Sequence, residues 1–120
     1  MKHLFALLMG CCLLGSSHAA SAYESRGARS CLGWQESRQD QKTGFSLNAE
    51  IYETWLVGYI SGIVAGSGTD FLAGTDNKVV FLMVDDFCDA NPNMNLAAAG
   101  TSVARQLMQE KGIVNRPTLP

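Results

Sequence analysis

The chain has 120 residues, 47% of them hydrophobic, and a formal net charge of −2 at pH 7. This length suits a single domain with a modest hydrophobic core. The mildly acidic balance argues against a nucleic-acid partner, because binding to phosphates requires a basic face.

Residues 1–22 have the order of a secretory signal peptide: a basic start, an apolar run over residues 4–14 and a small, polar end. Cleavage is expected after Ala19 or Ala22. The apolar run is too short for a transmembrane segment, which needs roughly 20 residues. We therefore expect a periplasmic or secreted protein. A lipobox-like Leu-Met-Gly-Cys sequence ending at Cys11 is a minor alternative that would leave a lipid anchor.

Cleavage after Ala22 leaves 8 lysines and arginines against 11 acidic residues, a net charge of −3, with no histidine. The cysteines that remain are Cys31 and Cys88, and in an oxidising compartment they should form a disulfide. Two unpaired buried thiols are the alternative. Without histidine, the commonest general base is missing, and two sulfurs alone fall short of a tetrahedral zinc site. We therefore predict a protein that is not an enzyme and holds no metal or cofactor.

After a loose tail over residues 23–29, Ser30 is expected to cap a helix that reaches about Gln39, followed by a turn at residues 42–44. A second helix is predicted from an N-cap at Asn48 to the stop at residues 66–68. Large apolar residues recur in it at helical spacing: Ile51, Tyr52, Trp55, Leu56, Tyr59, Ile60 and Ile63.

Gly58, Gly62 and Gly66 stand four residues apart in this second helix and therefore share one face. Each glycine destabilises a helix interior by about 1 kcal/mol relative to alanine. We expect the compensation to be close approach of another helix within the same domain. The alternative is a flat groove that receives a partner protein.

Asp70–Gly74 is predicted to connect the second helix to the third, with Phe71 and Leu72 turned inward. Thr75 or Asp76 should cap the third element. Six consecutive apolar residues at positions 79–84 fit either a buried strand or a buried helix. No second strand-like run is present to pair with them, and a lone strand is unstable, so we predict a helix that reaches Cys88 or Asp89.

The break at residues 91–93 precedes a last helix over about Leu96–Glu110, capped by Asn95 and closed by Gly112. Residues 113–120 should form an extended C-terminal tail. The expected fold is therefore all-α: a single compact domain of about four helices over residues 30–112, closed by one disulfide.

Two sets of polar and aromatic residues are candidate sites. Asp85 and Asp89 share a helix face and could bind a cation or act as an acid pair, but a solvated face with local ion pairs is the favoured interpretation. Among the aromatic residues, Trp34 and Tyr59 are the candidate partner contacts, with core packing as the alternative.

The Cys31-x-x-Trp34 start, the segments at residues 55–62 and 70–72, and Asp86-Phe87-Cys88 followed by Pro92 together resemble the Rap/Tai-type immunity proteins of type VI secretion. The resemblance spans Cys31 to about Gln109. It implies a helical periplasmic domain with a Cys31–Cys88 disulfide, often a homodimer, that binds and blocks a peptidoglycan amidase effector.

A periplasmic acid-stress chaperone similar to HdeA is the rival interpretation, since that protein is also small, helical and closed by one disulfide. Protonation of the 11 carboxylates would change the net charge from −3 to about +8 in acid. Such a change could expose apolar surface to unfolded client proteins.

Overall fold

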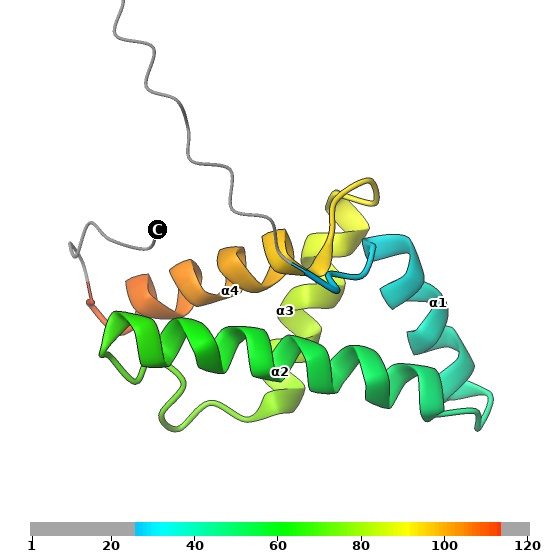
Figure 1. Ribbon diagram of the computed structural model, residues 1–120, viewed down its shortest axis with the longest axis horizontal. Coiled ribbons are helices and arrows are strands. Elements are labelled where there is room, and N and C mark those ends of the chain that lie inside the picture. Colours follow the sequence, from blue (N-terminus) through cyan, green and yellow to red (C-terminus); the bar gives the residue numbers. More distant parts are fainter. Residues whose placement is uncertain (1–25, 114–120) are drawn as a thin grey trace, which may run out of the picture.

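The computed structural model describes residues 26–113, which fold into four helices: α1 (Cys31–Lys42), α2 (Leu47–Ser67), α3 (Asn77–Ala90) and α4 (Leu96–Glu110) (Figure 1). Within these residues, β pairing is limited to a single bridge between Ser30 and Asn95. The predicted all-α domain is confirmed. The predicted signal peptide, Cys11 and residues 114–120 lie outside the described residues.

The longest helix, α2, packs against α1 and α4, and α3 contacts the same two helices while crossing the direction of α2 (Figure 1). All four helices and the connection between α2 and α3 contribute to one core. Its larger buried side chains are Trp34, Leu56, Ile60, Phe71, Val80, Val84, Leu96, Val103 and Leu107. Phe71 is fully buried, as predicted for the connecting segment.

Three of the four helices begin at the predicted caps, which are Ser30, Asp76 and Asn95. Each cap has an extended backbone, and its side-chain oxygen accepts a hydrogen bond from a backbone amide of the first turn. These bonds satisfy amides that have no partner within the helix. The donors are Gly33 N (3.1 Å), Lys78 N (2.7 Å) and Ala98 N (3.0 Å).

The predicted N-cap of α2 at Asn48 is wrong, because the helix begins at Leu47 with Ser46 in the cap position. Ser46 already has a helical backbone and makes no side-chain cap bond. Its hydroxyl instead donates to Glu50 Oε1 at 2.9 Å. At its other end α2 terminates at Gly68, which adopts a left-handed conformation with φ of 64°.

The ambiguous apolar run at residues 79–84 is helical, as predicted. Val80, Val84 and Cys88 are buried at a spacing of four residues, which is the spacing of one helix face. Val79 and Leu82 point outward and are 47% and 59% exposed. A continuous apolar run therefore places some of its large side chains in solvent.

The predicted loose tail is held in place over its last residues. The backbone amide of Leu96 donates to Arg29 O at 2.8 Å, and the Arg29 guanidinium lies 5.4 Å from the centre of the Tyr52 ring. Gly27 lies beside the Trp55 side chain. The low apolar content of this segment did not indicate these contacts, because they depend on backbone groups and on the Arg29 guanidinium.

The start of the predicted C-terminal tail is also fixed. The amide of Ile113 donates to Met108 O at 2.8 Å, and Ile113 packs against the core. Gly112 between them has a φ of 66°, as expected for a glycine that ends a helix. Ile113, the first residue of the predicted tail, is therefore packed against the domain.

Candidate binding surface and the clasp beneath it

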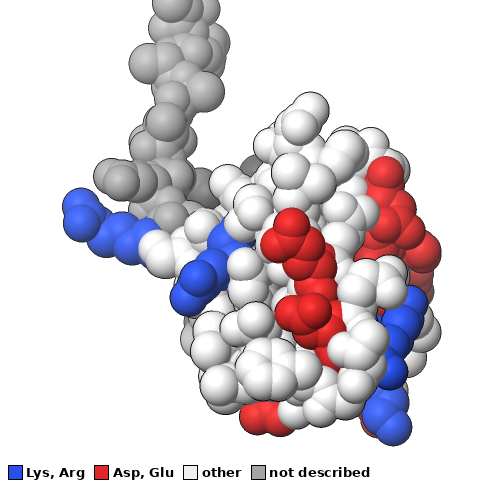
Figure 2. Space-filling view, turned by 90° about the vertical axis from the view of Figure 1, so that its right-hand side faces the viewer, with Lys and Arg blue, Asp and Glu red and all other residues white. Residues whose placement is uncertain are grey.

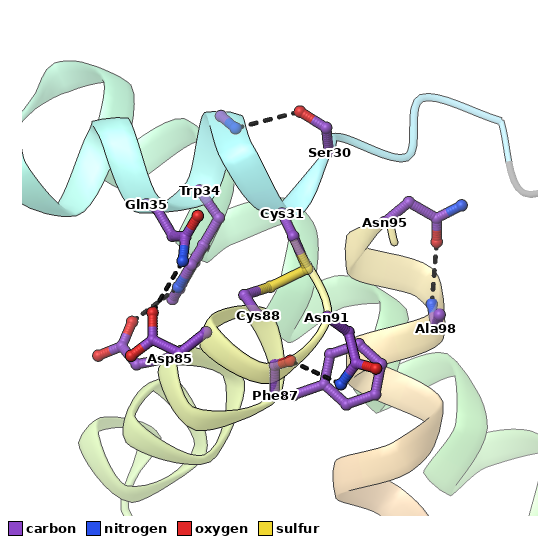
Figure 3. The surroundings of a disulfide bond; sticks show 12 residues. Ser30, Cys31, Trp34, Gln35, Asp85, Phe87, Cys88, Asn91, Asn95 and Ala98 are labelled. Atoms are coloured by element: carbon purple, nitrogen blue, oxygen red, sulfur yellow. Dashed lines mark hydrogen bonds between the residues drawn. A yellow bond between two sulfur atoms is a disulfide. The ribbon is translucent and has the colours of Figure 1, made fainter. Parts of the chain in front are cut away.

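A disulfide joins Cys31, the first residue of α1, to Cys88 near the end of α3 (Figure 3). The two Cα atoms lie 5.1 Å apart, and both residues are fully buried. The amide of Cys31 also donates to Met94 O at 2.9 Å. The predicted pairing is thus confirmed, and it ties the start of the domain to the end of its third helix.

Trp34, one turn after Cys31, lies inside the domain. Its side chain is fully buried, and its ring meets the Phe81 ring edge-on with centroids 5.9 Å apart. Its indole nitrogen donates to Asp85 Oδ1 at 2.7 Å (Figure 3). The prediction that Trp34 contacts a partner is therefore wrong, because the ring has no exposed surface to offer.

Arg38 connects three helices through its guanidinium group. It donates to both carboxylate oxygens of Asp85 on α3 at 3.2 Å and to Glu53 Oε1 on α2 at 3.0 Å. Its guanidinium carbon lies 5.5 Å from the centre of the Trp34 ring. Two-point bonding of this kind fixes orientation as well as distance. We call the disulfide together with Trp34, Arg38 and Asp85 the α1–α3 clasp.

The predicted acidic pair on α3 faces α1. Asp85 belongs to the clasp, and Asp89 Oδ1 accepts a hydrogen bond from Gln35 Nε2 at 2.8 Å. Both carboxylates therefore have partners on another helix, whereas the sequence suggested local ion pairs on a solvated face. Among residues 26–113, no group of three or more histidine, cysteine, aspartate or glutamate side chains is placed to hold a metal ion.

The two helices joined by the clasp also carry carboxylates that reach the surface. Glu36 on α1 and Asp86 and Asp89 on α3 are exposed, and Asp40 on α1 is half-buried. Figure 2 looks onto the α1 end of the domain and shows acidic side chains in separate patches, with lysines and arginines beside them. We call these four carboxylates and the surface around them the acidic face.

Tyr59, the other predicted partner contact, is half-buried between α2 and α4. Its hydroxyl lies 2.9 Å from Thr101 Oγ1, and its ring stacks on Trp55 with centroids 5.3 Å apart. Its ring also lies against Gly100, where a Cβ atom would come within 2.9 Å of it. Most of its contacts are therefore internal, and a role in partner binding stays a prediction.

The predicted close packing at Gly58, Gly62 and Gly66 is wrong for the described domain. A Cβ atom at any of the three would meet no other atom within 4 Å. The close approach between helices occurs instead at Gly33, beside Tyr52, and at Gly100. The spacing of the three glycines correctly predicted a shared face, but that face points away from the core.

Replacement of Gly58 by alanine is expected to raise the free energy of unfolding by up to about 1 kcal/mol, because alanine is the better helix former. Gly100→Ala is the matched contrast, since its methyl group would press on the Tyr59 ring, and it should destabilise the domain. Urea denaturation at low protein concentration measures both. A destabilised Gly58→Ala variant would contradict the open surroundings of this residue.

Several large apolar side chains are exposed. Phe45, just before α2, and Leu47 and Ile51, near its start, are 59%, 59% and 43% exposed. Ile51 is one of the large apolar residues that recur in α2 at helical spacing. Since α2 carries apolar residues on nearly all sides, its periodicity could not separate the buried side chains from the exposed ones.

No helix in the described part of the chain is both long enough and apolar enough to cross a membrane. No protein-family model, curated protein sequence or solved structure matches the chain. The fold and the clasp define its class as a small all-helical domain closed by one disulfide. A fold of this class can serve many functions, so the surface that it presents decides what the protein can bind.

Proposed function

We propose that this is a non-catalytic periplasmic binding protein of the immunity type, which binds and neutralises a cell-wall amidase effector. The observation that carries the proposal is the acidic face, whose carboxylates are presented by two helices fastened together by the clasp. Three features of the sequence also support the proposal: the signal-like segment at residues 1–22, the lack of histidine after it, and the resemblance to immunity proteins.

A fixed acidic surface suits the recognition of a folded protein with a basic face. The disulfide and the Arg38–Asp85 pair limit relative movement of α1 and α3, so little ordering is needed when a partner binds. Complementary charge would also speed association and favour the right partner over others. Such binding should weaken as salt rises, because exposed charges are screened.

The first experiment captures the partner. The oxidised chain from Tyr23 onward is immobilised and exposed to periplasmic extract, and bound proteins are identified by mass spectrometry. We expect a peptidoglycan amidase among the captured proteins. Binding of the chain should abolish cell-wall hydrolysis by this amidase in a turbidity assay. Recovery of no cell-wall hydrolase would count against the immunity role.

The second experiment locates the surface by calorimetry with the captured amidase. Glu36→Gln with Asp86→Asn, both exposed positions on the acidic face, should weaken binding at least about tenfold and reduce its salt dependence. Asp70→Asn with Glu110→Gln is the matched control, because it removes the same charge at the far end of the domain. Equal loss of affinity in the two double variants would show that only net charge matters.

An acid-stress chaperone is the second candidate, and the exposed apolar side chains favour it. Phe45, Leu47 and Leu82 are each 59% exposed and could hold unfolded segments of a client protein. The discriminating measurement is aggregation of a client near pH 2–3 with and without the chain, monitored by light scattering. Suppression of aggregation together with no captured hydrolase would favour this alternative.

A further inference from the structure

The disulfide between Cys31 and Cys88 is closed off from solvent. Both cysteines are fully buried, in the same core as Trp34 and Leu96. A reducing thiolate has to attack one of the two sulfur atoms directly, and it finds no path to either of them in the folded domain. Some part of the domain must therefore move before this bond exchanges with external thiols.

Helix α1 has the weakest apolar attachment to the core. Its buried residues are Cys31, Trp34 and Ser37, and its other large apolar side chain, Leu32, is exposed. The partly buried apolar side chains that pack against the core come from α2, α3, α4 and their flanking segments, and none comes from α1. Regions with few buried apolar contacts open locally at a lower free energy than the rest of a domain.

Beyond its first turn, α1 is held by polar side chains. Arg38 donates to Asp85 on α3 and to Glu53 on α2. Gln35 donates to Asp89 on α3. All of these side chains are half-buried or exposed, so water replaces their hydrogen bonds when the helix lifts and no buried group is left without a partner.

We propose that α1 is a gate for the disulfide. Thiols reach the bond only when α1 undocks from Trp34 onward, with Cys31 still tethered, while α2, α3 and α4 stay folded. The Trp34 ring and the bonds of Arg38 then set the rate of exchange. Because Glu36 and Asp40 lie on α1, the redox state of the disulfide also determines how firmly this half of the acidic face is attached.

Reduction by a dithiol such as dithiothreitol takes two exchanges. A thiolate of the reagent bonds to one cysteine sulfur, the Cys31–Cys88 bond breaks, and the released thiolate takes up a proton. The second thiol of the reagent then attacks the mixed disulfide and releases the first cysteine. The two cysteines gain two electrons and two protons in total, and the reagent becomes a cyclic disulfide.

The rate of this reduction tests the gate. The oxidised chain from Tyr23 onward, whose cysteines are Cys31 and Cys88, is treated with dithiothreitol and quenched with N-ethylmaleimide, and mass spectrometry counts the alkylated cysteines. Reduction of the folded chain should be at least about a hundredfold slower than reduction of the chain in denaturant. Urea below the unfolding transition should change the rate little, because undocking of one helix exposes little surface. A rate equal to that of the unfolded chain would overturn the proposal, and so would a rate that follows global unfolding.

Variants of the polar contacts locate the gate. Arg38→Met keeps an apolar stem but removes the guanidinium bonds, and it should speed reduction about tenfold. Glu53→Gln weakens one of these bonds and should have a smaller effect in the same direction. Arg105→Met removes the same charge on the exposed side of α4, and it should be reduced at the native rate. Reduction of Arg38→Met at the native rate would refute the role of α1.

A variant of α4 separates undocking of α1 from unfolding of the whole domain. Leu107 is buried near the end of α4, so Leu107→Ala should lower global stability, as urea denaturation will show. Its reduction rate in buffer should stay within about twofold of the native rate. Circular dichroism checks its fold, and Leu107→Val replaces it if it is unfolded. Acceleration in proportion to the lost stability would show that the disulfide is reached only by global unfolding, against the proposal.

Discussion

Replacement of Trp34 by alanine is expected to lower the free energy of unfolding by about 3–5 kcal/mol. The ring is fully buried and packs on Phe81, so its removal leaves a cavity in the core. It also leaves the Asp85 carboxylate without the indole N–H, which donates to it at 2.7 Å. Urea denaturation monitored by circular dichroism measures the change.

Two variants separate the packing of Trp34 from its hydrogen bond. Trp34→Phe keeps an aromatic ring but lacks the indole N–H, so its stability should lie between those of the native chain and Trp34→Ala. Leu32→Ala is the surface control on the same helix: Leu32 is 54% exposed, and its loss should change stability by no more than about 0.5 kcal/mol. A Trp34→Ala domain as stable as the native one would contradict the burial of this residue.

Removal of the disulfide by Cys31→Ser with Cys88→Ser is expected to lower the free energy of unfolding by about 4 kcal/mol. The bond spans 57 positions, and most of its effect comes from restricting the unfolded chain. For a domain of this length, such a loss corresponds to a fall in melting temperature of roughly 15–30 °C. Differential scanning calorimetry measures it.

Chemical reduction of the disulfide in the native chain is the control for the double variant. A reducing agent should move the unfolding transition of the native chain to that of the double variant, and it should leave the double variant unchanged. Thiol titration of the oxidised protein should detect no free thiol among the described residues. Two reactive thiols, or a native transition insensitive to reduction, would mean that Cys31 and Cys88 are not bonded.

The two variants weaken the same clasp in different ways. Trp34 stabilises the folded state through buried contacts, whereas the disulfide acts mainly on the unfolded chain. Because both residues lie in the first turn of α1 and hold it to α3, their combined effect should depart from the sum of the separate ones. If the acidic face is the binding surface, loss of the clasp should also weaken the amidase complex.

Local chemistry in the sequence determined the elements of this fold. Ser30, Asp76 and Asn95 mark helix starts because their side chains satisfy amides only three or fewer residues away. The pairing of Cys31 with Cys88 followed from their number and the predicted compartment. The start of α2 was predicted wrongly. Ser46 stands in the cap position but makes no side-chain cap bond, and the apolar residues of this helix do not indicate where it begins.

Only the tertiary structure decided which faces of these elements are covered. A tryptophan near a disulfide and three aligned glycines could each lie inside or outside, because local spacing says which residues share a face but not what packs on it. Trp34 is buried because α3 offers it Phe81 and Asp85, and the glycines of α2 are open because no helix of the domain packs there. Helix periods and caps act over a few residues, whereas burial depends on contacts between segments far apart in the chain.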